Sequence, residues 1–128
     1  MDKKYRVLLV DDDPDFITAT TIVLESQGYE VIVANEGNAG VETARREMPD
    51  LILLDVIMPV RDGFATAEVL KADPDLKQIP VVMLTSFGSA GQKTNIPASR
   101  GMGLETEDYL EKPVSPKDLL ACMAQYLK

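Results

Sequence analysis

The chain has 128 residues, of which 45% are hydrophobic and 27% charged, a composition typical of one globular domain and not of a disordered segment. Its formal net charge of −8 argues against binding of nucleic acid or anionic membranes, because an acidic surface repels phosphate groups. The single cysteine, Cys122, can form no internal disulfide, and the apolar runs are too short for a signal peptide or a spanning helix, so we expect a cytoplasmic protein.

Short apolar runs recur along the chain and predict strands. Each run is continuously apolar instead of alternating, which is typical of strands covered on both faces of a parallel sheet. Segments with helical spacing of apolar residues lie between them, around residues 16–24, 41–48 and 64–72. The runs are residues 7–10, 31–34, 51–54 and 81–84, with a weaker one around 109–110.

Helix start and stop signals support this alternation. Gly28 and Pro49 would end the first two helices, and Ser115-Pro116 with Asp118 would open a last one. The pattern predicts an α/β fold, with a parallel sheet and helices on both faces, whose ligands bind beyond the carboxyl ends of the strands. Helical positions expected to face the core include Val41, Ala44, Met48, Leu119, Leu120, Met123 and Leu127.

Polar residues of a distinctive kind follow four of the five runs. The acidic run 11–13 follows the first, Asp55 the third, Thr85 the fourth and Lys112 the fifth. Neighbouring parallel strands would bring them together, and carboxylates at close range repel one another unless a cation neutralises them. Oxygen ligands without histidine or paired cysteines favour Mg²⁺, or a similar hard ion such as Mn²⁺.

The same groups suit the transfer of a phosphoryl group. Asp55 is the candidate nucleophile, because a carboxylate can form a transient acyl phosphate. Lys112 would supply a fixed positive charge and Thr85 a hydroxyl donor to the phosphoryl oxygens.

At these residues, and over essentially its whole length, the chain resembles the receiver domains of bacterial two-component response regulators, the chemotaxis regulators among them. Each matching stretch is weak alone, but all four in order at strand ends make a specific pattern. The stretches are Val7-Leu8-Leu9-Val10-Asp11-Asp12-Asp13-Pro14, Leu53-Leu54-Asp55-Val56-Ile57-Met58-Pro59 followed by Asp62-Gly63, Val82-Met83-Leu84-Thr85-Ser86, and Asp108-Tyr109-Leu110-Glu111-Lys112-Pro113.

The resemblance implies how a metal and a phosphoryl group would be held. Asp11 and Asp12 would be the acidic metal-binding pair, with Asp13 outside the site. Asp55 would be both the phosphorylation site and a metal ligand. Ile57 would lend its backbone carbonyl to the metal.

The resemblance also implies a switch. Thr85 would turn its hydroxyl toward the new phosphoryl group, and Tyr109 would change rotamer behind it. Lys112 would be the ion-pair partner of the site, with a cis peptide bond to Pro113.

For the whole chain, the resemblance implies a flavodoxin-like sandwich with five strands in the order 2-1-3-4-5. Residues 1–128 would form one receiver domain without an output domain, either stand-alone or part of something larger. It would be a phosphoacceptor and not an enzyme, and would act on a downstream protein or a separate output domain. Because the chain contains no histidine, the phosphohistidine donor must belong to a histidine kinase or a histidine phosphotransfer protein. Homodimerisation on phosphorylation stays open.

One stretch departs from the family pattern. Several more residues separate Thr85 from Lys112 than receivers usually have, and residues 88–104 contain four glycines, one proline and no sustained apolar stripe. We therefore expect the fourth helix to be irregular or shortened.

Three other functions compete with this interpretation. A metal-dependent aspartyl phosphatase would need a second carboxylate where this chain has Ile57. A nucleotide- or flavin-binding domain would want a glycine- or hydroxyl-rich loop after the first strand, where the acidic run 11–13 lies. A receiver-like adaptor that only binds partners is the more serious rival, and the full set of site residues speaks against it.

Each site residue also has a plain structural interpretation. An acidic run is more often a solvated loop or a helix cap than a metal site. Thr85 could be there only because threonine is common in β-strands. Lys112 could be a surface lysine, and Tyr109 could merely pack against the sheet. Their joint placement at neighbouring strand ends favours the functional interpretation.

A kinetic prediction follows from two apolar residues. In the resemblance Ile57 and Phe87 occupy positions that influence how water reaches the acyl phosphate. We expect slow self-dephosphorylation, and faster loss of the phosphoryl group in a Phe87→Glu variant. Label retention over time measures both rates, and equal rates would contradict the prediction.

Overall fold

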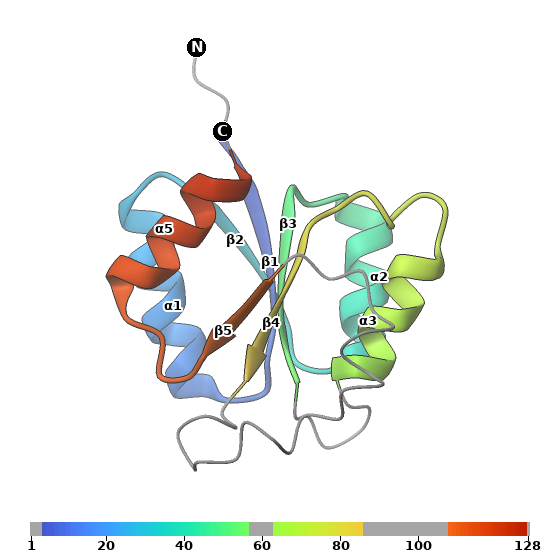
Figure 1. Ribbon diagram of the computed structural model, residues 1–128, viewed down its shortest axis with the longest axis horizontal. Helices are drawn as coiled ribbons and strands as arrows, with labels where there is room; N and C mark the ends of the chain where they lie inside the picture. The colour runs from blue at the N-terminus through green and yellow to red at the C-terminus, as the bar shows by residue number, and fades with distance from the viewer. Residues whose placement is uncertain (1–3, 57–62, 86–107, 128) are drawn as a thin grey trace.

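Five parallel strands form the centre of the molecule, in the order β2-β1-β3-β4-β5 (Figure 1). The protein is seen here in a computed structural model that describes residues 4–56, 63–85 and 108–127. The predicted α/β class and the predicted strand order are confirmed. The strands are β1 Arg6–Val10, β2 Glu30–Ala34, β3 Leu51–Asp55, β4 Val81–Thr85 and β5 Asp108–Glu111.

Helices cover both faces of this sheet. Figure 1 shows α1 and α5 on one side of the strands and α2 and α3 on the other. Successive residues of a strand point to opposite faces, so each apolar strand feeds two cores. The helices are α1 Pro14–Ser26, α2 Gly37–Glu47, α3 Gly63–Ala72 and α5 Pro116–Tyr126.

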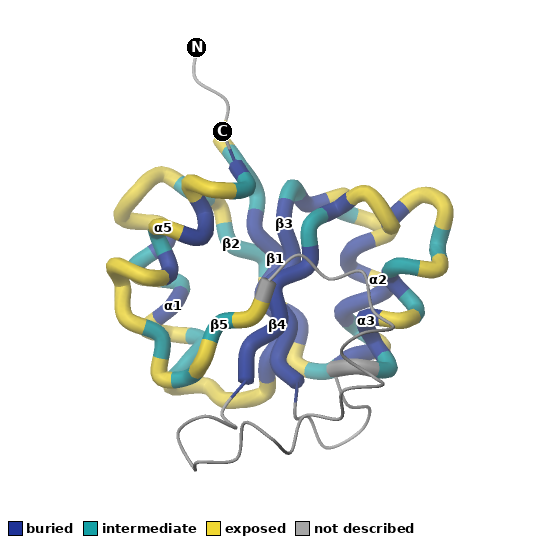
Figure 2. Tube along the Cα trace, viewed as in Figure 1, coloured by how far each residue is buried: buried dark blue, intermediate teal, exposed yellow. Residues whose placement is uncertain are grey.

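The strands β1, β3 and β4 are buried nearly throughout, which explains their continuous apolarity (Figure 2). Leu8, Ile52 and Met83 belong to the core shared with α2 and α3, whereas Leu9 and Leu53 belong to the core shared with α1 and α5. All five of these side chains are fully excluded from solvent. Truncation of such a leucine to alanine typically costs about 2–5 kcal/mol, so the central strands are held firmly in register.

The helices begin at the caps that the sequence contains. Asp13 caps α1, and its Oδ1 accepts hydrogen bonds from the backbone N–H groups of Asp15 and Phe16 at 3.0 and 3.4 Å. Ser115 caps α5 and accepts from the N–H of Asp118 at 3.1 Å, as its spacing predicted. These bonds satisfy donors that a helix cannot pair internally.

The end of α2 differs from the sequence prediction. Met48 was expected on the buried face, but it lies beyond the helix with φ of 47° and is 45% exposed. The following Pro49 disfavours right-handed helical backbone at Met48, so the chain leaves the helix there. Val41 and Ala44 are buried as predicted. The prediction of a shortened or irregular fourth helix concerns residues 88–104, which lie outside the described residues.

Gly40 allows α2 to approach β1 closely. A Cβ at this position would lie 2.9 Å from Cγ2 and 3.1 Å from Cγ1 of Val10, which is fully buried. Valine is stiff at χ1, so the contact cannot be relieved by simple rotation. Overpacking of this kind costs about 1–3 kcal/mol, which exceeds the ~1 kcal/mol that alanine gains over glycine in a helix.

We therefore expect Gly40→Ala to lower the free energy of unfolding by about 1 kcal/mol, measured by urea denaturation. In a Val10→Ala background the added methyl group has room, and the same substitution should become neutral or stabilising. Equal effects in the two backgrounds would show that the contact with Val10 is not what requires glycine.

Candidate functional site

The carboxyl ends of β1, β3, β4 and β5 lie side by side at one edge of the sheet. In the strand register Val10 pairs with Leu54, and Leu54 pairs with Met83. Thr85, at the end of β4, pairs with Glu111, the residue before Lys112. The topology therefore brings the polar residues that follow these strands into one group, at the edge where parallel α/β sheets place their ligand sites.

Three carboxylates meet at this edge. One carboxylate oxygen from each of Asp11, Asp12 and Asp55 lies within 4.8 Å of the others. Asp11 is fully buried and Asp55 is 6% exposed, whereas Asp12 is open to solvent. Two buried negative charges at such a distance require a compensating positive charge.

Lys112 supplies part of that charge. Its Nζ lies 2.8 Å from Oδ2 of Asp11 and 3.5 Å from Oδ1 of Asp55, and its side chain is 18% exposed. Burial lowers the pKa of Lys112, but the contacts with Asp11 and Asp55 outweigh burial and raise the pKa above its ordinary value. The side chain is therefore a fixed ammonium group at neutral pH.

The aspartates of the run 11–13 have two different structural roles. Oδ1 of Asp11 accepts a hydrogen bond from the N–H of Asp13 at 3.0 Å, which orients the Asp11 carboxylate at the end of β1. Asp13 turns its own carboxylate to the first turn of α1 as the helix cap. The interpretation of the run as a helix cap thus holds for Asp13, while Asp11 and Asp12 belong to the carboxylate group.

Thr85 and Tyr109 lie on the same face of the sheet. Tyr109 pairs with Met83, which precedes Thr85 by two residues on β4. Thr85 is 6% exposed and its carbonyl accepts from the N–H of Lys112, whereas Tyr109 is 37% exposed. The peptide bond from Lys112 to Pro113 is cis, and this prediction is confirmed.

The sequence interpretation did not place Phe16 in the site. It begins the first segment with helical spacing, residues 16–24, and its ring centroid lies 4.4 Å from Nζ of Lys112. The available signal is its position in the first turn of α1, three residues after the capping Asp13. Ile57, expected to lend a carbonyl to the metal, lies outside the described residues.

The residues of this group fit a divalent metal ion. Oδ2 of Asp11 is buried, and among the described residues it has the ion pair with Lys112 but no aligned hydrogen-bond donor. Asp12 and Asp55 offer further oxygens close by. An all-oxygen set that is partly open to water matches the preference of Mg²⁺, which keeps several of its water ligands.

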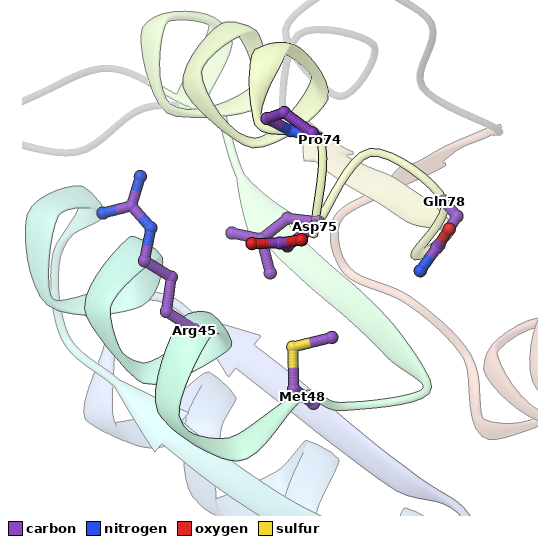
Figure 3. Close-up of a pocket in the computed structure, with 6 residues that line it drawn as sticks. Arg45, Met48, Pro74, Asp75 and Gln78 are labelled. Atoms are coloured by element: carbon purple, nitrogen blue, oxygen red, sulfur yellow. The ribbon is translucent and has the colours of Figure 1, made fainter.

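A cavity of about 510 Å³ lies elsewhere, between the end of α2 and the loop after α3 (Figure 3). Met48 precedes β3, and residues 74–78 precede β4, so this cavity lies at the amino ends of the strands. Arg45 on its rim binds Asp73 through two nitrogens, at 3.0 and 2.9 Å. We find no cluster of catalytic groups in its lining, which consists of Arg45, Met48, Pro74, Asp75, Leu76 and Gln78.

Within the described parts of the chain, no helix is both long and apolar enough to cross a membrane.

Comparison with known proteins identifies the family of the chain. The family model of the response regulator receiver domain matches residues 7–124. Protein PilH of Pseudomonas aeruginosa is 37% identical over 115 residues, which are 90% of this chain and 91% of PilH. The master transcriptional regulator RpaA of Synechocystis is 37% identical over 96% of this chain but 49% of its own length. The chain thus spans about half the length of several curated relatives that it matches.

Solved structures show the same fold. The chemotaxis response regulator CheY4 of Vibrio cholerae has a TM-score of 0.85 and 30% identity, covering 98% of this chain and all of that one. The receiver domain of a sensor histidine kinase from Pseudomonas aeruginosa has a TM-score of 0.82 and 27% identity, covering 97% and 98% of the two chains. That structure contains a magnesium ion coordinated in its active site cleft.

The carboxylate group predicts a measurable stabilisation by Mg²⁺. Binding to the folded state alone should raise the free energy of unfolding by about 2.7 kcal/mol when free Mg²⁺ is one hundred times its Kd. Thermal unfolding with and without Mg²⁺ measures this effect. It should be lost in Asp12→Asn but kept in Asp15→Asn, a matched loss of one charge outside the group. Equal stabilisation of both variants would place the bound ion elsewhere.

Proposed function

The chain belongs to the family of response regulator receiver domains, the phosphoacceptor domains of two-component signalling, and we propose that Asp55 is the residue that accepts the phosphoryl group. The observation that carries this proposal is the position of the Asp55 carboxylate at the end of β3, next to Asp11, Asp12 and Lys112. A carboxylate so placed is a nucleophile with a cation already beside it.

The donor that we propose is a phosphohistidine on a histidine kinase or a histidine phosphotransfer protein. These 128 residues contain no histidine, so the donor lies outside them. An oxygen of Asp55 attacks the phosphorus, and the phosphorus–nitrogen bond breaks with its electron pair passing to the imidazole. The products are an acyl phosphate on Asp55 and a free histidine on the partner.

Lys112 and Thr85 stabilise the charge of the phosphoryl group during this step. The ammonium of Lys112, 3.5 Å from the attacking carboxylate, lies within reach of an oxygen of the incoming group. The hydroxyl of Thr85, at the neighbouring strand end, supplies a hydrogen-bond donor. Because the ammonium already lies beside Asp11 and Asp55, less reorganisation is needed when the charge develops.

Asp11, Asp12 and Asp55, with the carbonyl of Ile57, are the residues that would hold Mg²⁺ or Mn²⁺. When bound, the ion supplies positive charge that screens Asp55 from the anionic donor. Asp12 is exposed and accessible to an ion from solvent, while Asp11 is oriented by its bond to the Asp13 N–H.

We propose that Thr85 and Tyr109 form the switch. Both lie on the same face of β4 and β5, so a movement of the Thr85 hydroxyl toward the phosphoryl group changes the space behind it, where Tyr109 can turn inward. Phosphorylation then shifts the population of two surface states near these strands. The surface would be read by a downstream protein or a separate output domain.

The remaining elements of the proposal concern the whole protein. We take residues 1–128 as one receiver domain that acts as a phosphoacceptor and not as an enzyme on another substrate. The cytoplasm is the compartment that fits it, because its buried single cysteine, Cys122, suits a reducing environment. A homodimer formed on phosphorylation is compatible with this proposal.

Incubation with Mg²⁺ and acetyl phosphate tests the phosphoacceptor role directly. Intact mass should reveal one phosphoryl adduct on the wild type and none on Asp55→Asn. Lys112→Met should form the adduct about a hundredfold more slowly, because a charge donor to the transferring group is lost. Asp15→Asn serves as the control, since its carboxylate lies outside the group. A wild type without adduct under any donor would leave an adaptor that only binds partners.

A further inference from the structure

Phe16 lies beside Lys112 at the carboxyl ends of the strands, where its side chain contributes no polar atom. Its ring centroid is 4.4 Å from Nζ of Lys112, a distance at which a cation is attracted to the face of an aromatic ring. The two residues come from opposite ends of the chain, Phe16 from the first turn of α1 and Lys112 from the segment after β5. The contact therefore depends on the packing of α1 against that segment.

The position of Phe16 is built by the fold. The N–H of Phe16 donates to Oδ1 of Asp13, and Pro14 occupies the first turn, so the backbone of residue 16 is fixed at the helix start. Its ring is half-buried against the core shared by α1 and α5. It also forms one wall of an apolar cavity of about 210 Å³, whose other lining residues include Val23, Val114 and Leu119.

The ammonium of Lys112 needs a further contact that limits its movement. A lysine side chain is a flexible stem with a point charge at its end, and here it is shared unequally between Asp11 at 2.8 Å and Asp55 at 3.5 Å. The ring of Phe16 provides a third contact that is not a carboxylate. It attracts the ammonium without competing for the phosphoryl group.

We propose that Phe16 is a positioning residue, whose ring face holds the Lys112 ammonium beside Asp55 for phosphoryl transfer. This inference rests on the proposed function, because it assigns to Lys112 a role in that reaction. Phe16 itself makes no bond to the reacting atoms. Its contribution is to narrow the positions that the ammonium samples before the phosphoryl group arrives.

The contact can be measured without phosphorylation. The Hε protons of Lys112 should show an upfield ring-current shift in the nuclear magnetic resonance spectrum of the metal-free wild type. Phe16→Leu, which keeps apolar bulk but has no ring, should abolish the shift, and Phe16→Tyr should retain it. An unshifted Lys112 in the wild type would overturn the inference.

The kinetic test uses acetyl phosphate with saturating Mg²⁺, because this small donor needs no docking surface. Phe16→Leu should lower the maximal rate of adduct formation about three- to tenfold, the range expected for loss of a cation–π contact. Its half-saturating acetyl phosphate concentration should stay unchanged, and Phe16→Tyr should restore the rate. Val23→Ala, which removes bulk from the same cavity further along α1, should leave the rate at the wild-type value.

The outcomes separate this inference from the proposed function. A wild-type rate for Phe16→Leu, with the adduct still on Asp55, would overturn the positioning role and leave the proposed function intact. A rate lowered equally by Phe16→Leu and Val23→Ala would assign Phe16 to packing alone, and would also overturn it. If the wild type formed no adduct, both would fail together.

Discussion

The arrangement of side chains at the carboxyl ends of the strands depends on one electrostatic requirement, which is the neutralisation of the buried negative charges of Asp11 and Asp55. Both carboxylates are almost completely buried, and Asp12 brings a third negative charge to within 4.8 Å. Breaking a buried ion pair by removing one partner is strongly destabilising, because it leaves an uncompensated charge. The ammonium of Lys112 supplies one positive charge, so the group still carries a negative excess that a divalent ion can balance. The proposed metal binding and the proposed phosphoryl transfer both depend on this arrangement of charges.

The rest of the fold serves to hold these charges at a fixed distance. The apolar strands β1 and β3 are buried on both faces, so neither can shift in register without moving an entire row of core side chains. Helix α1 begins directly after the acidic run 11–13. Its cap, Asp13, also donates its backbone N–H to the carboxylate of Asp11, which links the helix start to the carboxylate group. The same helix start carries Phe16 to the ammonium of Lys112. Core packing, helix capping and the position of Lys112 are therefore coupled at the start of α1.

Much of this arrangement could be predicted from the sequence, because strand ends in a parallel sheet have a known geometry. The α/β class, the cap at Ser115 and the gathering of acidic residues follow from local patterns, whereas the strand order was implied by the resemblance to receiver domains. Met48 was wrongly predicted to lie on the buried face of α2, because the helical spacing of apolar residues continues through it. The following Pro49 disfavours helical backbone at Met48, so the chain leaves the helix there. The contact of Phe16 with Lys112 was not predictable, since no periodicity relates side chains so distant in sequence. Ile57 and Phe87 remain predictions, as they lie outside the described residues.

A crystal structure of the protein grown with Mg²⁺ and beryllium fluoride, a mimic of the phosphoryl group, would show whether Asp11, Asp12, Asp55 and Lys112 act on one ion and one phosphoryl group. We expect one ion bound by carboxylate oxygens of Asp11, Asp12 and Asp55, with the beryllium fluoride on Asp55. Lys112 and Thr85 should contact the fluorine atoms. An ion bound away from these carboxylates, or a Lys112 ammonium turned away from Asp55, would contradict this expectation.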